Sequence, residues 1–305
     1  MSEMPRDPIA ALPAPLPGFA PRFARDGVAL AASALLALLV LAAVFAPWIA
    51  PQNPYDLAQL DILDGKLAPG AAGADGRHYL LGTDDQGRDI LSAMLYGMRT
   101  SLLAGTASTL LALAIGLFAG LCAAWFRGWT DALIMRVADL QLSFPSILIA
   151  LVLLALLGQG LDKIIFALVA VQWAYYARTA RAAAMAEREK DYLGAATALG
   201  LTATRIIFRH LLPNCLPPLM VVATVQIAAA ISLEATLSFL GLGLPITEPS
   251  LGLLIANGYS HLLSGKYWIS FFPGMALLAL IVCINLVADR LRDLLDPRRA
   301  DTGEN

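Results

Sequence analysis

The sequence is poor in the residues that build metal centres, disulfides and catalytic groups. Its 305 residues include three histidines and three cysteines, and charged residues make up only 14%. The histidines lie far apart in the chain, which argues against a histidine-based metal or catalytic centre. Cys122, Cys215 and Cys283 lack the paired spacing of a zinc site, so we interpret them as small apolar core residues.

Nucleotide-binding and hydrolase motifs are also missing from the sequence. A phosphate-binding loop needs Gly-Lys followed by Ser or Thr, but Lys66 and Lys266 are followed by Leu67 and Tyr267. There is no nucleophile elbow and no HExxH motif. We therefore expect no enzymatic activity, cofactor or metal in this chain itself. The formal net charge of -2 gives no reason to expect nucleic acid as a partner.

Apolar residues, in contrast, are abundant: 58% of the chain is hydrophobic and the mean hydropathy is +0.69. This composition indicates a protein surrounded by membrane lipid, and about 20 apolar residues suffice to cross a bilayer as a helix. We expect the fourth apolar segment to leave the bilayer early, because Trp173, Tyr175, Tyr176 and Arg178 follow its apolar half. The fold class predicted is an all-α polytopic membrane protein with six transmembrane helices, at Val28–Ile49, Ser101–Phe126, Ala132–Leu157, Ile164–Ala186, Leu216–Leu240 and Trp268–Ala288.

The spans divide the chain into five parts with a predicted orientation. Most of the 21 Lys and Arg residues fall on one side, which predicts that both termini are cytoplasmic. The first apolar run is longer than that of a signal peptide, so we expect it to remain as an anchor. The parts are a cytoplasmic tail (1–27), the first transmembrane helix (28–49), an extracytoplasmic segment with an interfacial helix (50–100), a five-helix core (101–290) and a cytoplasmic tail (291–305).

A cytoplasmic loop, Asp191–Pro213, separates the fourth and fifth spans. We expect Gly200 to end a short helix in the left-handed conformation, Thr202 to cap a second turn, and Pro213 to open the next span. Small side chains would make this loop a low knob that fits closely into a groove of another protein. One face of the first short helix is expected to carry Tyr192, Ala195, Ala196 and Leu199.

The loop resembles the EAA loop of ABC importer permeases through Ala195, Ala196, Gly200, Leu212 and Pro213. The glutamate usual in that family falls at Gly194 here, so no carboxylate role is assigned to this position. Four further motifs are similar to the dipeptide/oligopeptide/nickel branch of these permeases, and within it to the second permease type. They are LGTDDQGRDILSAMLYGMRTSL (81–102), RVADLQLSFPSILIAL (136–151), LEATLSFLGLG (233–243) and LRDLLDPR (291–298).

The resemblance implies a type I ABC importer permease in a bacterial cytoplasmic membrane. Its partners would be a second related permease, two cytoplasmic ATPases that bind ATP and Mg, and an extracytoplasmic substrate-binding protein. Di- or oligopeptides are the first substrate expected, while nickel complexes, glutathione and other small solutes stay open. The resemblance assigns ATPase coupling to Asp191, Tyr192, Ala195, Ala196, Leu199, Gly200, Arg205, Leu212 and Pro213.

Polar residues inside the spans are candidates for the translocation path or a gate. Glu234 is the one carboxylate well inside a predicted span, and two interpretations stay open: a path-lining role, or a structural hydrogen bond. Gln226, Ser232 and Ser238 share this ambiguity. Pro145 is expected to kink the third span, and Asp139 to pair with Arg136 one turn earlier.

Three further patterns concern packing and the extracytoplasmic side. Asp84, Asp85 and Asp89 do not have the spacing of an EF-hand, so we reject a calcium site. The stripe Ile90, Leu91, Met94, Leu95 and Met98 predicts an interfacial helix, and Gly65–Gly76 together with Pro245–Tyr267 is a candidate contact for the binding protein.

Small residues at every fourth position predict close helix packing within the subunit, at Ala112, Gly116, Gly120 and Ala124.

Two other classes of function have to be weighed. A secondary transporter should show two related halves and several midplane charges or broken helices, and the sequence shows neither clearly. A membrane anchor or assembly subunit would not need a shaped cytoplasmic knob between two spans. The pattern as a whole favours the permease subunit of an ATP-driven importer.

Overall fold

The computed structural model describes residues 26–74 and 76–295, and the regular elements of this part of the chain are all helices. The expected N-terminal tail, apart from its last two residues, and residues 296–305 of the C-terminal tail lie outside it. The long helices are α2 (Gly27–Val44), α4 (Ile90–Phe126), α7 (Leu161–Arg188), α10 (Leu212–Phe239) and α12 (Trp268–Leu295). Shorter ones are α3 (Ala46–Ile49), α5 (Gly128–Leu142), α6 (Ser146–Leu157), α8 (Asp191–Ala198), α9 (Ala203–Ile206), the π-helical turn Ile207–Leu211 and α11 (Leu251–Tyr259).

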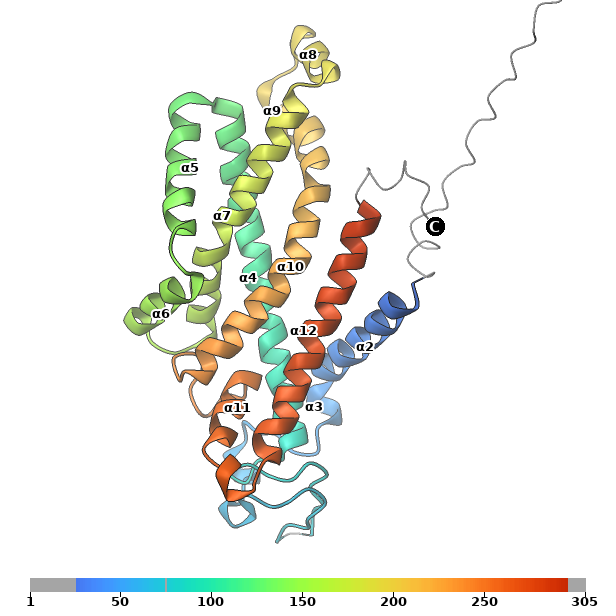
Figure 1. Ribbon diagram of the computed structural model, residues 1–305, viewed down its shortest axis with the longest axis vertical. Coiled ribbons are helices and arrows are strands. Elements are labelled where there is room, and N and C mark those ends of the chain that lie inside the picture. The colour runs from blue at the N-terminus through green and yellow to red at the C-terminus, as the bar shows by residue number, and fades with distance from the viewer. Residues whose placement is uncertain (1–25, 75, 296–305) are drawn as a thin grey trace, which may run out of the picture.

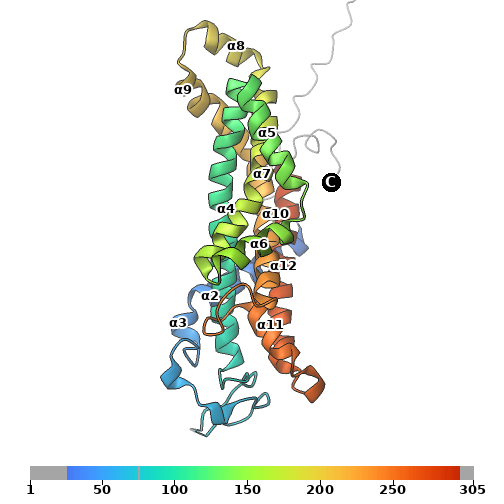
Figure 2. The same ribbon diagram turned by 90° about the vertical axis from the view of Figure 1, so that its left-hand side faces the viewer.

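The molecule is elongated, with its long helices running roughly along one axis. Helices α4, α7 and α10 form its centre, α12 packs on α10, and α2 packs on α12 (Figures 1 and 2). Helices α8 and α9 project at one end, called here the α8 end, while α11 and the segment 50–89 lie at the opposite end (Figure 1). Asp26 and Arg290 form an ion pair of 3.7 Å between the start of α2 and the last turns of α12.

The surface of the long helices is rich in exposed apolar side chains. Phe118 on α4, Leu156 on α6 and Phe166 on α7 are each more than half exposed, although nearly all soluble proteins avoid large contiguous surfaces of this kind. Such side chains are compatible with contact to lipid, in which every backbone polar group must be satisfied inside the helix. The helical architecture and its surface together agree with the polytopic fold class predicted from the sequence.

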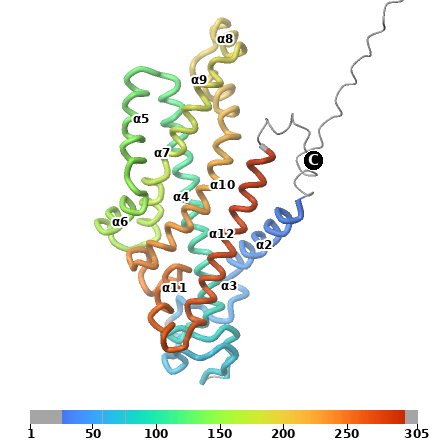
Figure 3. Tube along the Cα trace, in the orientation of Figure 1, coloured from blue at the N-terminus to red at the C-terminus, as the bar shows by residue number. Residues whose placement is uncertain are grey.

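The number of spans differs from the prediction of six. Four helical stretches are long and apolar enough to cross a membrane, and a fifth span is added if the bent pair α5 and α6 counts as one. The third expected span is broken there, because α5 ends before Ser143 and Pro145 precedes α6, with a bend of 91° between them (Figure 3). The kink expected at Pro145 is therefore confirmed.

Helix α7 is the other difference from the expected spans. It forms as one helix of 28 residues, but it is not among the stretches that pass on length and apolarity. The physical reason is that polar residues follow its apolar first half, with Arg178 and Arg181 on the same helix. The same polar residues are the reason why the sequence predicts that this segment leaves the bilayer early.

Between α3 and α4, the described residues form two short 3-10 turns, Leu57–Gln59 and Ile62–Asp64, and no separate interfacial helix. Asp89 caps α4 by accepting a hydrogen bond from the amide of Ser92, and α4 then runs unbroken for 37 residues. Of the expected lipid-facing stripe, Ile90, Leu95 and Met98 are buried against protein. The prediction is wrong because the stripe packs on α3, α11 and α12, contacts that periodicity cannot distinguish from a membrane surface.

Small residues allow α4 and α7 to approach closely, as the spacing predicted. A Cβ atom added to Gly116 would lie 2.5 Å from Cβ of Tyr176 and closer still to the carbonyl oxygen of Trp173. One added to Gly120 would lie 2.7 Å from Cβ of Ala180. This packing lies within the subunit and places the backbones of the two helices in direct contact.

We predict that Gly116→Ala destabilises the protein, because the added methyl group forces α4 and α7 apart. Overpacking of this kind costs about 1–3 kcal/mol, and it should lower the thermal unfolding midpoint in detergent. The matched control is Gly274→Ala in α12, where no atom lies within 4 Å of the new Cβ. Equal midpoints for the two variants would contradict the close packing of α4 on α7.

Candidate coupling loop and polar networks

The knob at the α8 end is built by a helix stop at Gly200. The amide of Leu201 donates to the carbonyl of Ala196 at 3.2 Å, and the amide of Gly200 donates to that of Thr197 at 3.0 Å. Gly200 has φ of +73°, the left-handed conformation expected from the sequence. The chain reverses there and enters α9, so α8 and α9 meet at an angle (Figure 1).

The two alanines of the loop lie on different faces of α8. Ala196 is buried, and so is Leu193, which belongs to an apolar cluster that includes Tyr176 of α7 and Leu211. Ala195 is exposed, and Leu199 is 81% exposed just after the helix. The expectation that Ala195 and Ala196 share one face is therefore wrong, since Ala196 anchors the knob and Ala195 belongs to its outer surface.

The remaining loop residues divide in the same way between exposure and packing. Asp191 and Arg205 are exposed, Leu212 is partly buried, and Pro213 lies in the first turn of α10, where its missing N–H costs little. Thr202 lies at the N-cap position of α9, but its side chain makes no capping hydrogen bond, unlike the prediction.

Tyr192 joins the knob to both neighbouring long helices. Its hydroxyl donates to Oε1 of Glu187 at 2.5 Å and accepts from Nδ2 of Asn214 at 3.0 Å. The second carboxylate oxygen of Glu187 pairs with Nζ of Lys190 at 2.7 Å. Desolvation, together with the bond to the Glu187 carboxylate, raises the pKa of Tyr192 to about 12, so the hydroxyl keeps its proton and remains a donor at neutral pH.

Charged side chains near the α8 end connect α7 to its neighbours. Arg188 donates to the carbonyl oxygens of Ala124 and Trp125 at the end of α4, and its guanidinium lies 5.0 Å from the ring centroid of Trp125. Arg178 pairs with Asp139 at 2.6 Å. The expected partner Arg136 on the same helix is thus replaced by a residue of α7, because α5 folds back along α7 (Figure 3).

Glu234 of α10 is fully buried where this helix packs on α4. Its two carboxylate oxygens accept hydrogen bonds from Ser101 at 2.6 Å and from Ser238 at 2.8 Å. These hydrogen bonds agree with the structural interpretation of Glu234 and Ser238, and a role in the translocation path stays a prediction. Gln226 and Ser232 are partly buried, and the Ser232 hydroxyl donates back to the carbonyl of Ala228 at 2.9 Å.

The break at Pro145 is held by a side chain that the sequence did not single out. Gln141 donates to the carbonyl oxygens of Ala170 and Val171 and accepts from the indole N–H of Trp173. All three partners lie on α7. The break between α5 and α6 is thus fixed to α7 by hydrogen bonds. A movement of α5 away from α7 would break them.

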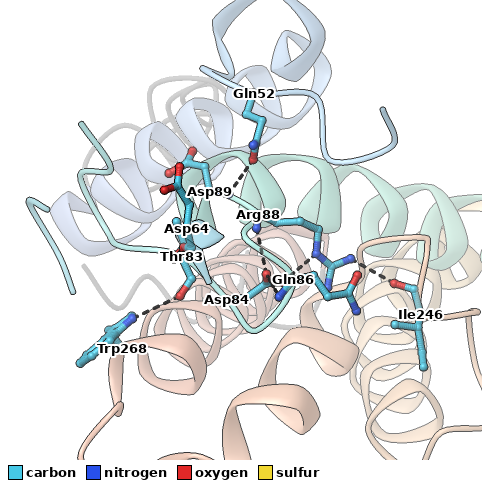
Figure 4. A network of polar contacts seen from close by, with 9 residues as sticks. All are labelled: Gln52, Asp64, Thr83, Asp84, Gln86, Arg88, Asp89, Ile246 and Trp268. Atoms are coloured by element: carbon cyan, nitrogen blue, oxygen red, sulfur yellow. Dashed lines mark hydrogen bonds and ion pairs between the residues drawn. The ribbon is translucent and has the colours of Figure 1, made fainter. Parts of the chain in front are cut away.

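A second polar network lies at the opposite end (Figure 4). Arg88 is 1% exposed, its Nε pairs with Asp84 at 2.6 Å, and its Nη1 donates to the carbonyl oxygen of Ile246 at 3.0 Å. The side chain of Gln52 accepts from the amide of Asp89 at 2.7 Å. Burial raises the pKa of Asp84, and the neighbouring Arg88 counteracts that shift.

This network was missed in the sequence, although its spacing was visible. Asp84 and Arg88 are four residues apart, a spacing at which two charged side chains can pair, but the calcium hypothesis concerns the aspartates alone. Asp64 is also buried, and it accepts from the hydroxyl of Tyr79 and the amide of Ala74. The network ties the segment 50–89 to the loop between α10 and α11, and the glycine-rich part of that segment is folded around Asp64.

Comparison with known proteins gives consistent matches over most of the chain. Residues 112–301 match the family described as binding-protein-dependent transport system inner membrane component, and residues 19–69 match the N-terminal TM domain of oligopeptide transport permease C. The chain is 38% identical over 293 residues to the di/tripeptide transport system permease protein DppC of Pseudomonas aeruginosa, covering 96% of this chain and 95% of the relative.

Further relatives and a solved structure agree with these matches. The dipeptide transport system permease protein DppC of Escherichia coli is 38% identical over 302 residues, covering 98% of this chain and 99% of the relative. A putative peptide transport system permease protein of Brucella suis is 42% identical over 264 residues, with 87% and 86% covered. The MetNI methionine ABC transporter, in an inward facing conformation, shares the fold at 20% identity with a TM-score of 0.55, covering 66% of this chain and 96% of that chain.

We predict that Arg88→Met destabilises the protein, because it leaves the Asp84 carboxylate buried without its partner. Breaking a buried pair in this way costs about 3–5 kcal/mol, which the thermal unfolding midpoint should report. The control is Arg99→Met, which removes an exposed arginine from α4. Asp84→Leu combined with Arg88→Met should recover part of the loss, whereas a single variant as stable as the control would contradict a structural pair.

Proposed function

Because this chain belongs to the family of binding-protein-dependent transport system inner membrane components, we propose that it is a permease subunit of an ATP-driven importer of di- or oligopeptides. The named peptide permeases cover nearly its full length, which supports the substrate class. In this proposal the chain forms part of the translocation path and leaves ATP hydrolysis to separate subunits.

The observation that carries the proposal is the shape of the knob at the α8 end. Its outer surface presents Gly194, Ala195, Ala198 and Gly200, next to the large apolar side chain of Leu199, which is 81% exposed. A surface of small residues lets a partner approach the backbone closely, and an exposed leucine gives it an apolar anchor. We infer that this surface docks in a groove of an ATPase subunit.

The proposed orientation places the α8 end on the cytoplasmic side of the bacterial inner membrane. Basic residues are concentrated at this end, which fits the preference of positive charge for the cytoplasm. They include Arg178, Arg181, Arg188, Lys190, Arg205 and Arg209. The ion pair between Asp26 and Arg290 brings the ends of α2 and α12 together, so both termini would lie on one side.

The remaining partners follow from the same proposal. Two ATPase subunits would bind ATP and Mg, a second related permease would complete the path, and an extracytoplasmic binding protein would deliver the substrate. Closure of the ATPases around ATP would displace α8 and shift the population of inward-open and outward-open packings. The segment 50–89 and the loop from Pro245 would face the binding protein.

The first test is the composition and activity of the purified complex. The tagged chain should copurify from mild detergent with an ATPase and a second permease, and in liposomes the complex should hydrolyse ATP faster when a peptide-loaded binding protein is added. Stimulation by a nickel complex or by glutathione, and not by peptides, would overturn the substrate class. A chain that transports without any ATPase would overturn the proposed function.

We predict that Ala195→Trp abolishes stimulated ATP hydrolysis while membrane insertion stays intact. The indole would hold the partner away from the exposed small-residue surface, and Ala195 has ordinary helical geometry, so the change adds bulk without backbone strain. Ala195→Ser is the control at the same site and should keep activity. Normal stimulated hydrolysis in the tryptophan variant would contradict docking at this surface.

A further inference from the structure

The Tyr192 hydroxyl makes its hydrogen bonds inside the subunit and not at the outer surface of the knob. Sequence similarity groups Tyr192 with the residues that would touch an ATPase, but its hydroxyl is directed into its own subunit, to Glu187 of α7 and Asn214 of α10. We propose that these three side chains, the Tyr192 clasp, are positioning residues that transmit movement of α8 to α7 and α10 together. This inference rests on the proposed function, since it names the internal half of the coupling device.

The geometry favours transmission because the clasp spans three helices at one atom. The hydroxyl of Tyr192 is donor to a carboxylate at 2.5 Å and acceptor from an amide at 3.0 Å, so both of its hydrogen-bonding roles are used. Hydrogen bonds to a charged group are the stronger kind. Movement of α8 therefore acts on two long helices at once, through hydrogen bonds that share one oxygen atom.

Each arm of the clasp is itself held in place. Glu187 is 7% exposed, and Lys190 holds its other oxygen at 2.7 Å, which fixes the carboxylate toward Tyr192. Nδ2 of Asn214 also donates to the carbonyl oxygen of His210 at 2.7 Å, within the π-helical turn that leads into α10. Flexible side chains would absorb a displacement, whereas side chains fixed at both ends pass it on.

The contacts continue from the clasp to the rest of the bundle. Arg188, next to Glu187, donates to two carbonyl oxygens at the end of α4, so α7 and α4 are joined at the same level. Farther along, Ser101 of α4 and Glu234 of α10 are joined by a hydrogen bond of 2.6 Å. Helices α4, α7 and α10 thus form one frame, and α8 grips it at the Tyr192 clasp.

Tyr192→Phe tests the inference, because it removes the hydroxyl and keeps the ring. In reconstituted complexes we expect normal copurification with the ATPase and near-normal ATP hydrolysis, while peptides imported per ATP fall about tenfold, as for loss of bonds to a charged group. Tyr259→Phe, a change of the same kind at the opposite end of the molecule, should keep the wild-type ratio. Asn214→Leu removes the α10 arm and carries the same expectation if Tyr192→Phe does not accumulate.

Replacement of Glu187 tests whether its hydrogen bond to Tyr192 is needed for import, separately from the stability of the protein. Glu187→Gln keeps an oxygen that can accept from Tyr192 and should retain most of the import per ATP, while Glu187→Leu should lose it. The clasp is overturned if Tyr192→Phe imports as many peptides per ATP as wild type, or if it loses ATPase binding, which would make Tyr192 a docking residue. Failure of the wild-type chain to bind an ATPase would instead overturn the proposed function.

Discussion

Close approach of α4 and α7 is the constraint on which the rest of the structure depends. In lipid, apolar burial does not drive helices together, so association relies on packing and on small residues that bring backbones into contact. Gly116 and Gly120 supply that contact, with Tyr176 and Ala180 directly against them. Helix α7 is thereby fixed along α4, and the knob that α7 carries is fixed with it.

Polar networks then determine how the ends of this bundle are arranged. At one end Arg188 and the Tyr192 clasp join α4, α7, α8 and α10. At the other, the buried pair of Asp84 and Arg88 attaches the segment 50–89 to the loop after α10. Buried charges cost free energy unless they are paired, so each network has one low-energy arrangement and joins elements that are distant in sequence.

These networks give the proposed transport cycle a physical frame. A displacement of α8 reaches α7 and α10 through side chains that are fixed at both ends, and α4 follows through Arg188 and Ser101. The break between α5 and α6 is held to α7 by Gln141, so a shift of α7 would act on this break as well. Packed helices of this kind switch between states and do not deform continuously.

The sequence by itself determined the helical membrane architecture, the helix stop at Gly200, the kink at Pro145 and the small-residue packing of α4, because these follow from local propensity and spacing. Only the tertiary structure decided that α4 begins at Ile90, that Ala196 faces inward while Ala195 faces outward, and that Asp139 pairs with Arg178. It also brought Glu187, Tyr192 and Asn214 together. The physical reason is that periodicity shows which residues share a face of a helix, but not whether lipid, another helix or a partner protein covers that face.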